Sequence, residues 1–114
     1  MLNVTNLNNS EFIETDFREG YLPSVKFKSA NLENADLRGA ILKNTDFTSA
    51  KLKGAKLKGA TIDNTFFEGA EISGIDLTGK EFVNADFLYV RINDNVCSTD
   101  EKDIILEGHL QTLF

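Results

Sequence analysis

The residues that could carry out chemistry are few in this chain of 114 residues. His109 is its single histidine, and no Ser/His/Asp or Cys/His arrangement can be built around it. Cys97 is its single cysteine, which excludes an intramolecular disulfide and a multi-cysteine metal site. Asp94 and Asp100 lie near that cysteine in sequence and disfavour a reactive thiolate. Without a Gly-rich phosphate loop or a metal motif, the sequence predicts a non-enzymatic protein with no cofactor and no metal.

Composition and charge set the class of protein. The chain is 41% hydrophobic, which predicts one small folded domain rather than a disordered segment. No run approaches the ~20 apolar residues that a membrane helix needs, so we expect no membrane span. The first residues lack the basic and apolar regions of a signal peptide, which favours a cytoplasmic location. The net charge of −6 makes a nucleic-acid partner unlikely, because such binders neutralise phosphates with cations.

A repeat of five residues organises the chain. From Leu2 to Ile92, all nineteen residues at every fifth position are Leu, Phe or Ile. Two places before each of them, from Thr5 to Val90, fourteen of eighteen residues are Ala, Thr, Ser or Gly. Five is neither the helical period of 3.6 nor the strand period of 2, so the chain must turn a corner in every repeat. Such a pattern predicts a solenoid whose units bury a core only by stacking.

The repeat resembles that of a known family. The segment ANLENADLRGA at residues 30–40 resembles the consensus A(D/N)LXX of pentapeptide-repeat proteins. The resemblance covers residues 2–96. It implies an all-β fold, a right-handed quadrilateral parallel β-helix with four pentads in each coil of 20 residues. A step of 20 indeed connects four phenylalanines: Phe27, Phe47, Phe67 and Phe87. We therefore expect a β-helix of just under five coils over residues 1–96.

The ends of this solenoid need covers. Residues 97–114 are expected to cap the last coil, because Ser98 and Glu101 match a helical capping box and predict a short helix over about 99–107. Three apolar residues follow and form either a contact with the cap or a dimer contact: Leu110, Leu113 and Phe114. No N-terminal cap is visible, so that end is open or stacks on a partner. A homodimer through one end of the solenoid is therefore possible.

The outward positions are mostly charged or polar. Residues 20 apart should be vertical neighbours, and Lys51, Glu71 and Arg91 alternate in charge along one such column. Asp16 above Asp36 is an unfavourable exception without an explanation in the sequence. Four lysines (Lys51, Lys53, Lys56 and Lys58) form a basic cluster, but acidic residues above and below it predict a solvated surface rather than a nucleic-acid site.

Some outward positions are apolar, and these form the candidate interaction surface: Tyr21, Ile41, Phe66, Leu88 and Tyr89. Tyr21 and Ile41 should be vertical neighbours, with Phe66 on the next side of the coil. Leu88 and Tyr89 either contact the predicted helix or a partner. One inward position holds Lys80, which is costly to bury, so we expect the backbone to bulge outward there.

The expected function is that of a rigid scaffold or protein-interaction module with an unknown protein partner. The resemblance implies a bacterial source and one specific alternative, since some members of the family are acidic DNA mimics that modulate DNA gyrase or topoisomerase. Residues 2–96 hold 14 acidic and 11 basic residues, a balance of −3. A ~22 Å length of B-DNA carries about 13 negative charges, so mimicry is weakly supported. A regulatory accessory module of an enzyme or signalling protein is the second alternative.

Overall fold

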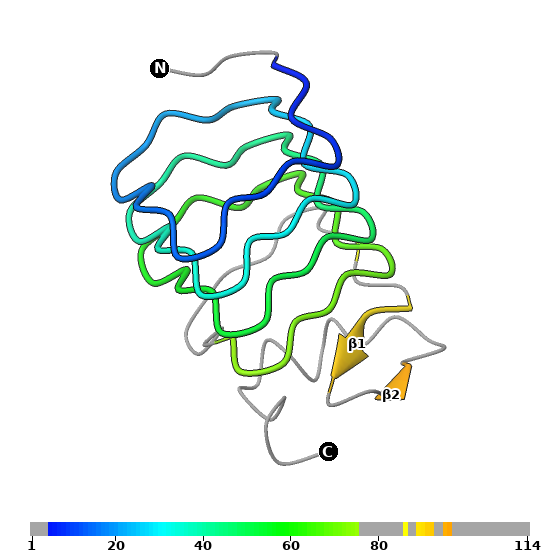
Figure 1. The fold of residues 1–114 in the computed structure, drawn as a ribbon. Helices are drawn as coiled ribbons and strands as arrows, with labels where there is room; N and C mark the ends of the chain where they lie inside the picture. The colour runs from blue at the N-terminus through cyan, green and yellow to red at the C-terminus, as the bar shows by residue number, and fades with distance from the viewer. Residues whose placement is uncertain (1–4, 76–85, 87–88, 93–94, 97–114) are drawn as a thin grey trace.

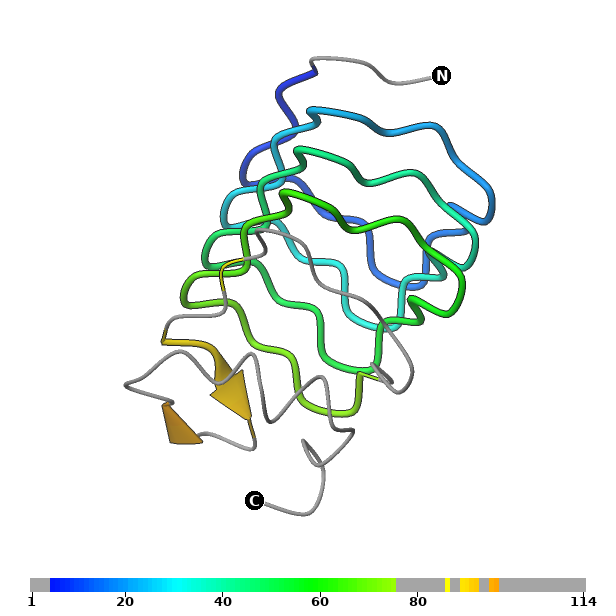
Figure 2. The same cartoon turned by 180° about the vertical axis from the view of Figure 1, so that it is seen from behind.

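The chain winds into flat coils that stack along one axis. The computed structural model describes residues 5–75, 86, 89–92 and 95–96. Figure 1 shows the coils running from blue to green, each lying directly over the next, and Figure 2 shows the same stack from behind. The solenoid expected from the five-residue repeat is therefore present.

Each coil contains 20 residues. Parallel β-bridges join residues that are 20 apart, such as Asn6 with Lys26 and Lys26 with Asp46. These bridges form four columns, which define the four sides of the coil. Side 1 carries Asn6, Lys26, Asp46, Phe66 and Asp86; side 2 carries Glu11, Asn31, Lys51, Glu71 and Arg91; side 3 carries Asp16, Asp36 and Lys56; side 4 carries Tyr21, Ile41 and Thr61. Four pentads per coil are thus confirmed over the described residues.

A tight turn after each side explains the period of five. The amide of Ala30 donates to the carbonyl of Phe27 at 2.9 Å and closes such a turn, in which Ser29 has a φ of +59°. A β-turn of this kind requires a left-handed residue at its third position, where Gly and Asn are favoured. Glu14, Glu19 and Tyr89 occupy the same position with positive φ despite their larger side chains. One left-handed residue per pentad therefore turns the chain through each corner.

The interior of the coils is filled by the inward residues. Phe27, Phe47 and Phe67 form a stacked column, with ring centroids 5.3 Å and 5.4 Å apart and interplanar angles of 2° and 13°. From Leu22 onward, leucines and isoleucines fill the other three sides and are buried together with the small residues between them. In the first coil, Leu7, Phe12 and Phe17 are only partly buried. Val25, Ile75 and Val90 depart from the small pattern but are equally buried. The two inward positions of each pentad are as the sequence predicts.

The two strands of the structure follow the last parallel bridges. Strand β1, Arg91–Ile92, pairs with strand β2, Asn95–Val96, in an antiparallel ladder with Arg91 opposite Val96. Both strands lie at the end of the stack away from the N-terminus (Figures 1 and 2). The parallel pattern of the coils therefore gives way here to a local antiparallel pair.

Several expectations concern residues outside the described part of the chain. They are the helical cap over 99–107, the tail residues Leu110, Leu113 and Phe114, the bulge at Lys80 and the position of Leu88. The described residues contain no helix, so the α-helical cap has no support here. They also contain no helix that could span a membrane.

Candidate functional site

The exposed apolar residues lie on three sides of the solenoid. Tyr21 is 47% exposed and pairs directly with the half-buried Ile41 on side 4, as the spacing of 20 predicts. Phe66 is 43% exposed on side 1, where it lies between Asp46 and Asp86. Tyr21 and Ile41 thus lie together on side 4, while Phe66 lies between two aspartates on side 1.

Two further exposed apolar residues lie apart from that pair. Tyr89 is 48% exposed at the corner after side 1, and Ile13 is 51% exposed on side 2. Ile13 is not among the residues predicted from the sequence, although its outward place directly after the inward Phe12 is a usable signal. The exposed apolar residues therefore do not form one continuous patch in the described structure.

The polar surface is built from a local hydrogen bond that recurs in the pentads. An Asp or Asn directly before the inward residue accepts the backbone N–H two residues later, as Asn6 does from Asn8 at 3.0 Å and Asp46 from Thr48 at 2.9 Å. This bond satisfies an amide in the turn, which is why short side chains with an oxygen suit the position. The D/N of the A(D/N)LXX repeat therefore has a structural cause.

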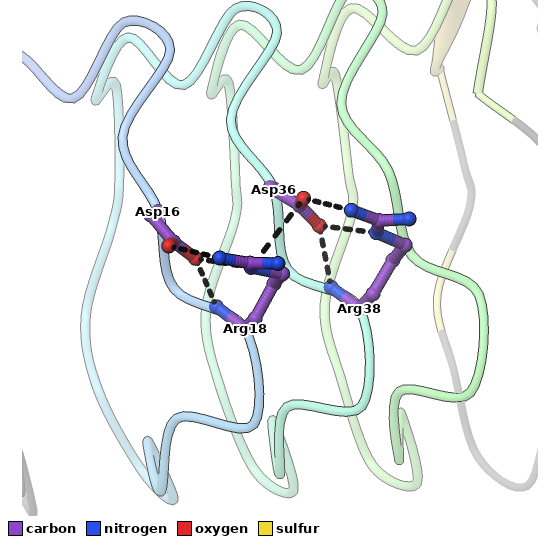
Figure 3. A network of polar contacts seen from close by, with 4 residues as sticks. All are labelled: Asp16, Arg18, Asp36 and Arg38. Atoms are coloured by element: carbon purple, nitrogen blue, oxygen red, sulfur yellow. Dashed lines mark hydrogen bonds and ion pairs between the residues drawn. The ribbon is translucent and has the colours of Figure 1, made fainter.

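On side 3, two arginines add side-chain bonds to this backbone bond and form bidentate ion pairs with the aspartates. We call each bidentate Arg–Asp pair a fork. Arg18 donates from Nε to Oδ1 of Asp16 at 3.0 Å and from Nη2 to Oδ2 at 2.9 Å. Arg38 makes the same pair of bonds to Asp36 at 2.8 Å and 2.6 Å (Figure 3). The Nε of Arg18 also lies 4.0 Å from Oδ2 of Asp36. The close approach of the two aspartates, unexplained by the sequence, is thus compensated within each pentad.

The forks change the titration of the carboxylates. The hydrogen bonds from the Arg18 side chain, reinforced by its backbone amide, lower the pKa of Asp16 to about 2. Those from Arg38 likewise lower the pKa of Asp36 below its usual range. Each arginine is held in its charged form, since its carboxylate partner raises its pKa. Both pairs are therefore ionised at neutral pH.

Three hollows mark the described surface. An open groove of about 870 Å³ follows the corner after side 3, between the column of Arg18, Arg38 and Lys58 and the corner residues Glu19, Gly39 and Gly59. A depression of about 310 Å³ lies on side 3 itself, and its charged lining residues are Arg38, Lys56 and Lys58. A third hollow of about 570 Å³ has a lining that includes Glu33, Lys51, Glu71, Tyr89 and Arg91.

None of these hollows holds the groups of a catalytic site. Among the described residues, no three His, Cys, Asp or Glu side chains are close enough together to hold a metal ion. The polar residues described in the lining of the three hollows are mostly charged, with Tyr89 as the aromatic member. This arrangement can bind ions or polar groups of a partner, which is the chemistry of an interaction surface.

Comparison with known proteins identifies the family. The family model described as pentapeptide repeats (8 copies) matches residues 2–39 and 26–64. The chain belongs to the pentapeptide-repeat family. A search of curated proteins returned no match. The family fold is a right-handed β-helix solenoid, which agrees with the coils and the bridges described above.

Solved structures of pentapeptide-repeat proteins resemble this one. A pentapeptide repeat protein from the cyanobacterium Cyanothece 51142 is 27% identical, with a TM-score of 0.62 over 79% of this chain and 58% of that protein. One from Nostoc PCC 7120 is 22% identical, with a TM-score of 0.56 over 92% and 81% of the two chains. QnrB1, a plasmid-mediated fluoroquinolone resistance protein, is 22% identical, with a TM-score of 0.50 over 78% of this chain and 49% of QnrB1. This chain therefore spans little more than half the length of the Cyanothece protein.

Proposed function

We propose that this pentapeptide-repeat protein is a non-enzymatic scaffold that binds a protein partner through an outer side of the solenoid. The pairing of the exposed Tyr21 with Ile41 on side 4 carries the proposal. Tyrosine is enriched in protein interfaces because its ring is apolar and its hydroxyl is polar. Both residues belong to a bridged column, so the backbone holds them at a fixed spacing.

The filled interior supports an interaction role over a catalytic one. The inward side chains of the described coils, such as Phe47, Leu52 and Leu57, are completely buried and leave the outer sides as the surface for recognition. On these sides, residues 20 apart form straight columns. Such a surface is rigid before it meets a partner, which reduces the entropy lost on binding.

A co-purification experiment tests the role of side 4. The double variant Tyr21→Ser/Ile41→Ser should lose a partner that the wild-type chain retains from its native cell extract. Ile13→Ser is the matched control, because it removes a side chain of similar exposure from side 2. Identical partner sets for the wild type and both variants would refute the proposal, provided that all three give the same circular dichroism spectrum.

Modulation of DNA gyrase is the alternative that the family resemblance implies, while the likeness to QnrB1 concerns the fold alone at this identity. The column of Arg18, Arg38 and Lys58 on side 3 is unlike the anionic backbone of DNA. A supercoiling assay decides the matter, since inhibition of gyrase at micromolar protein would favour mimicry over scaffolding. A scaffold that regulates an enzyme or signalling protein would instead copurify with that protein.

The ends of the solenoid complete the proposal. We expect residues 97–114 to cap the last coil, with a short helix over about 99–107 followed by the apolar residues Leu110, Leu113 and Phe114, which either pack on the cap or join two chains. Light scattering of a chain that lacks residues 108–114 distinguishes these outcomes, since only a dimer contact would halve the mass. A cytoplasmic location remains part of the proposal and rests on the sequence alone.

A further inference from the structure

The third complete coil concentrates positive charge on two of its sides. Its four lysines are all exposed, and they divide between side 2 and side 3. On side 2, Lys51 is bridged to Glu71, and Glu33 occupies the position 20 residues before Lys53. A carboxylate neighbour is therefore available to each lysine of side 2.

Among the described residues, the one carboxylate bridged to the lysines of side 3 is already committed, and Asp76, 20 residues after Lys56, lies outside that part of the chain. Lys56 follows Asp36 in the bridged column, but that carboxylate is already held by Arg38 at 2.6 Å. Lys58 lies 20 residues after Arg38, and both residues line the same two hollows. The ammonium group of Lys58 therefore has a guanidinium, not a carboxylate, as its neighbour in the preceding coil. The repeated Asp–x–Arg of the first two coils thus becomes Lys–x–Lys in the third, so that Arg38, Lys56 and Lys58 lie around the single carboxylate of Asp36 among the described residues.

Arg38 still has donors to offer. Its fork to Asp36 uses the Nε–H and one of the two N–H groups of Nη2. A guanidinium carries five N–H donors, so three remain. The fork also fixes the orientation of the guanidinium, as Figure 3 shows, and a donor held in place loses less entropy on binding.

The hollow on side 3 has room for an anion beside these cations. Arg38, Lys56 and Lys58 line the depression of about 310 Å³, together with Gly54 and Gly74 from the adjacent corner. The described residues of its lining include no carboxylate. Gly54 and Gly74, with φ of +71° and +74°, add no side chains to that flank, where the side chain of Asn34 lies beside Gly54. An oxyanion can therefore approach the three cations from this edge.

We propose that Arg38, Lys56 and Lys58 form a binding site for a phosphate group. A phosphate ester carries about −1.5 to −2 charges at pH 7, so the three cations attract it. Arginine supplies a planar set of donors and lysine a point charge, a combination typical of phosphate sites. The phosphate group belongs either to a free phosphoryl compound or to a phosphorylated side chain of a protein. This inference does not depend on the partner proposed for side 4.

A titration followed by NMR tests the site on the full-length chain. Inorganic phosphate should shift the amide signals of Arg38, Lys56 and Lys58 along a saturable curve. Lys56→Gln/Lys58→Gln should weaken this binding by about tenfold or more, because two charge-assisted contacts are lost. Lys51→Gln/Lys53→Gln is the matched control, since it removes the same charge from the same coil, and it should retain the affinity within about twofold.

Each outcome decides something. An equal loss in the two double variants would attribute binding to general electrostatics and overturn the proposal, as would shifts that never saturate. A phosphoserine peptide that binds much more tightly than inorganic phosphate, with no binding of its unphosphorylated form, would identify a phosphorylated protein as the source. Equal affinities would identify a free phosphoryl compound. The four lysines are exposed, so both double variants should keep the wild-type circular dichroism spectrum.

Discussion

Arg38 holds the carboxylate of Asp36 through two parallel bonds, from Nε to Oδ1 at 2.8 Å and from Nη2 to Oδ2 at 2.6 Å. The backbone amide of Arg38 adds a third bond to Oδ1 at 3.2 Å. One residue therefore satisfies both oxygens of its neighbour two places before it. The same unit one coil earlier, Asp16 with Arg18, lets two aspartates face each other in a parallel bridge.

The forks predict a loss of stability in acid. Asp16 has a pKa of about 2 in the folded chain, below its ordinary value of 3.8. A carboxyl group whose pKa is lowered by folding stabilises the fold above its unfolded pKa, and this contribution disappears as the pH falls through the folded pKa. The free energy of unfolding should therefore decline between pH 4 and pH 2. Urea denaturation at a series of pH values measures this decline.

Arg18→Gln separates the fork from the other carboxyl groups. Without the guanidinium, the pKa of Asp16 should return towards 3.8, and the decline of stability between pH 4 and pH 2 should become smaller. A ¹³C titration of the Asp16 carboxyl carbon follows the pKa directly. An unchanged pKa of Asp16 in this variant would show that the backbone amide alone lowers it.

A second prediction concerns two buried threonines with different acceptors. Thr45 donates from Oγ1 to the carbonyl of Leu22 at 2.8 Å, and Thr65 donates to the carbonyl of Leu42 at 2.9 Å. The Leu42 carbonyl also accepts the amide of Thr45 at 3.0 Å, whereas the Leu22 carbonyl has no second donor among the described residues. Thr45→Val should therefore cost about 1–3 kcal/mol by leaving a buried carbonyl unpaired.

Thr65→Val is the matched comparison. Its acceptor keeps one hydrogen bond, so the cost should be near the ordinary net value of about 1 kcal/mol. Urea denaturation of the two variants measures the difference. Equal costs would indicate that water reaches the Leu22 carbonyl in Thr45→Val.

The sequence predicts the interior of this fold better than its surface. An inward residue at every fifth place makes the column of Phe27, Phe47 and Phe67 a matter of counting in steps of 20. The forks were missed because charge pairing was sought between coils, while Arg18 pairs within its own pentad. Residue type also gives no warning that Tyr89 takes a left-handed turn position, because the repeat imposes that conformation on any residue there.

The aromatic column gives a third prediction. Phe47 stacks on Phe27 and on Phe67, and it is completely buried. Phe47→Ala should lower the free energy of unfolding by about 3–5 kcal/mol, since it opens a cavity in a packed core. Phe47→Leu should cost less, about 1–2 kcal/mol, because leucine fills most of the space of the phenylalanine side chain. Leucine already occupies the equivalent inward position on the other sides of the coil.

Chemical denaturation of the two variants tests the column. The slope of the denaturation curve should stay constant, because neither change alters the number of coils. A cost below about 1 kcal/mol for Phe47→Ala would contradict a tightly packed interior, since it would require the neighbouring coils to close the cavity.

Two corner glycines give a fourth prediction. Gly54 and Gly59 have nearly the same backbone conformation, with φ of +71° and +75°. A Cβ at Gly59 would have its nearest neighbour, the amide nitrogen of Gly39, 3.7 Å away, whereas at Gly54 it would collide with Oδ1 of Asn34. Gly59→Ala should cost about 1–2 kcal/mol for the left-handed conformation alone, and Gly54→Ala should cost more.

A double variant isolates the collision. Asn34→Gly removes the amide side chain one coil before Gly54, so Gly54→Ala in that background should cost no more than Gly59→Ala in the wild type. Thermal denaturation compares five chains: the wild type, Gly59→Ala, Gly54→Ala, Asn34→Gly and Asn34→Gly/Gly54→Ala. If Gly54→Ala costs the same in both backgrounds, the side chain of Asn34 moves aside freely.

Tyr89 gives the last prediction. It has a φ of +60° at a corner where the preceding coils place Asn9, Ser29, Ser49 and Gly69. A bulky residue in this conformation is a true outlier, and asparagine adopts it with less strain. Tyr89→Asn should therefore raise the free energy of unfolding by about 1 kcal/mol. Tyr89→Phe keeps the strain and removes only the hydroxyl, so its stability should equal that of the wild type. If Tyr89→Asn were instead less stable, the contacts of the half-exposed ring in the hollow with Lys51, Glu71 and Arg91 would outweigh the backbone strain.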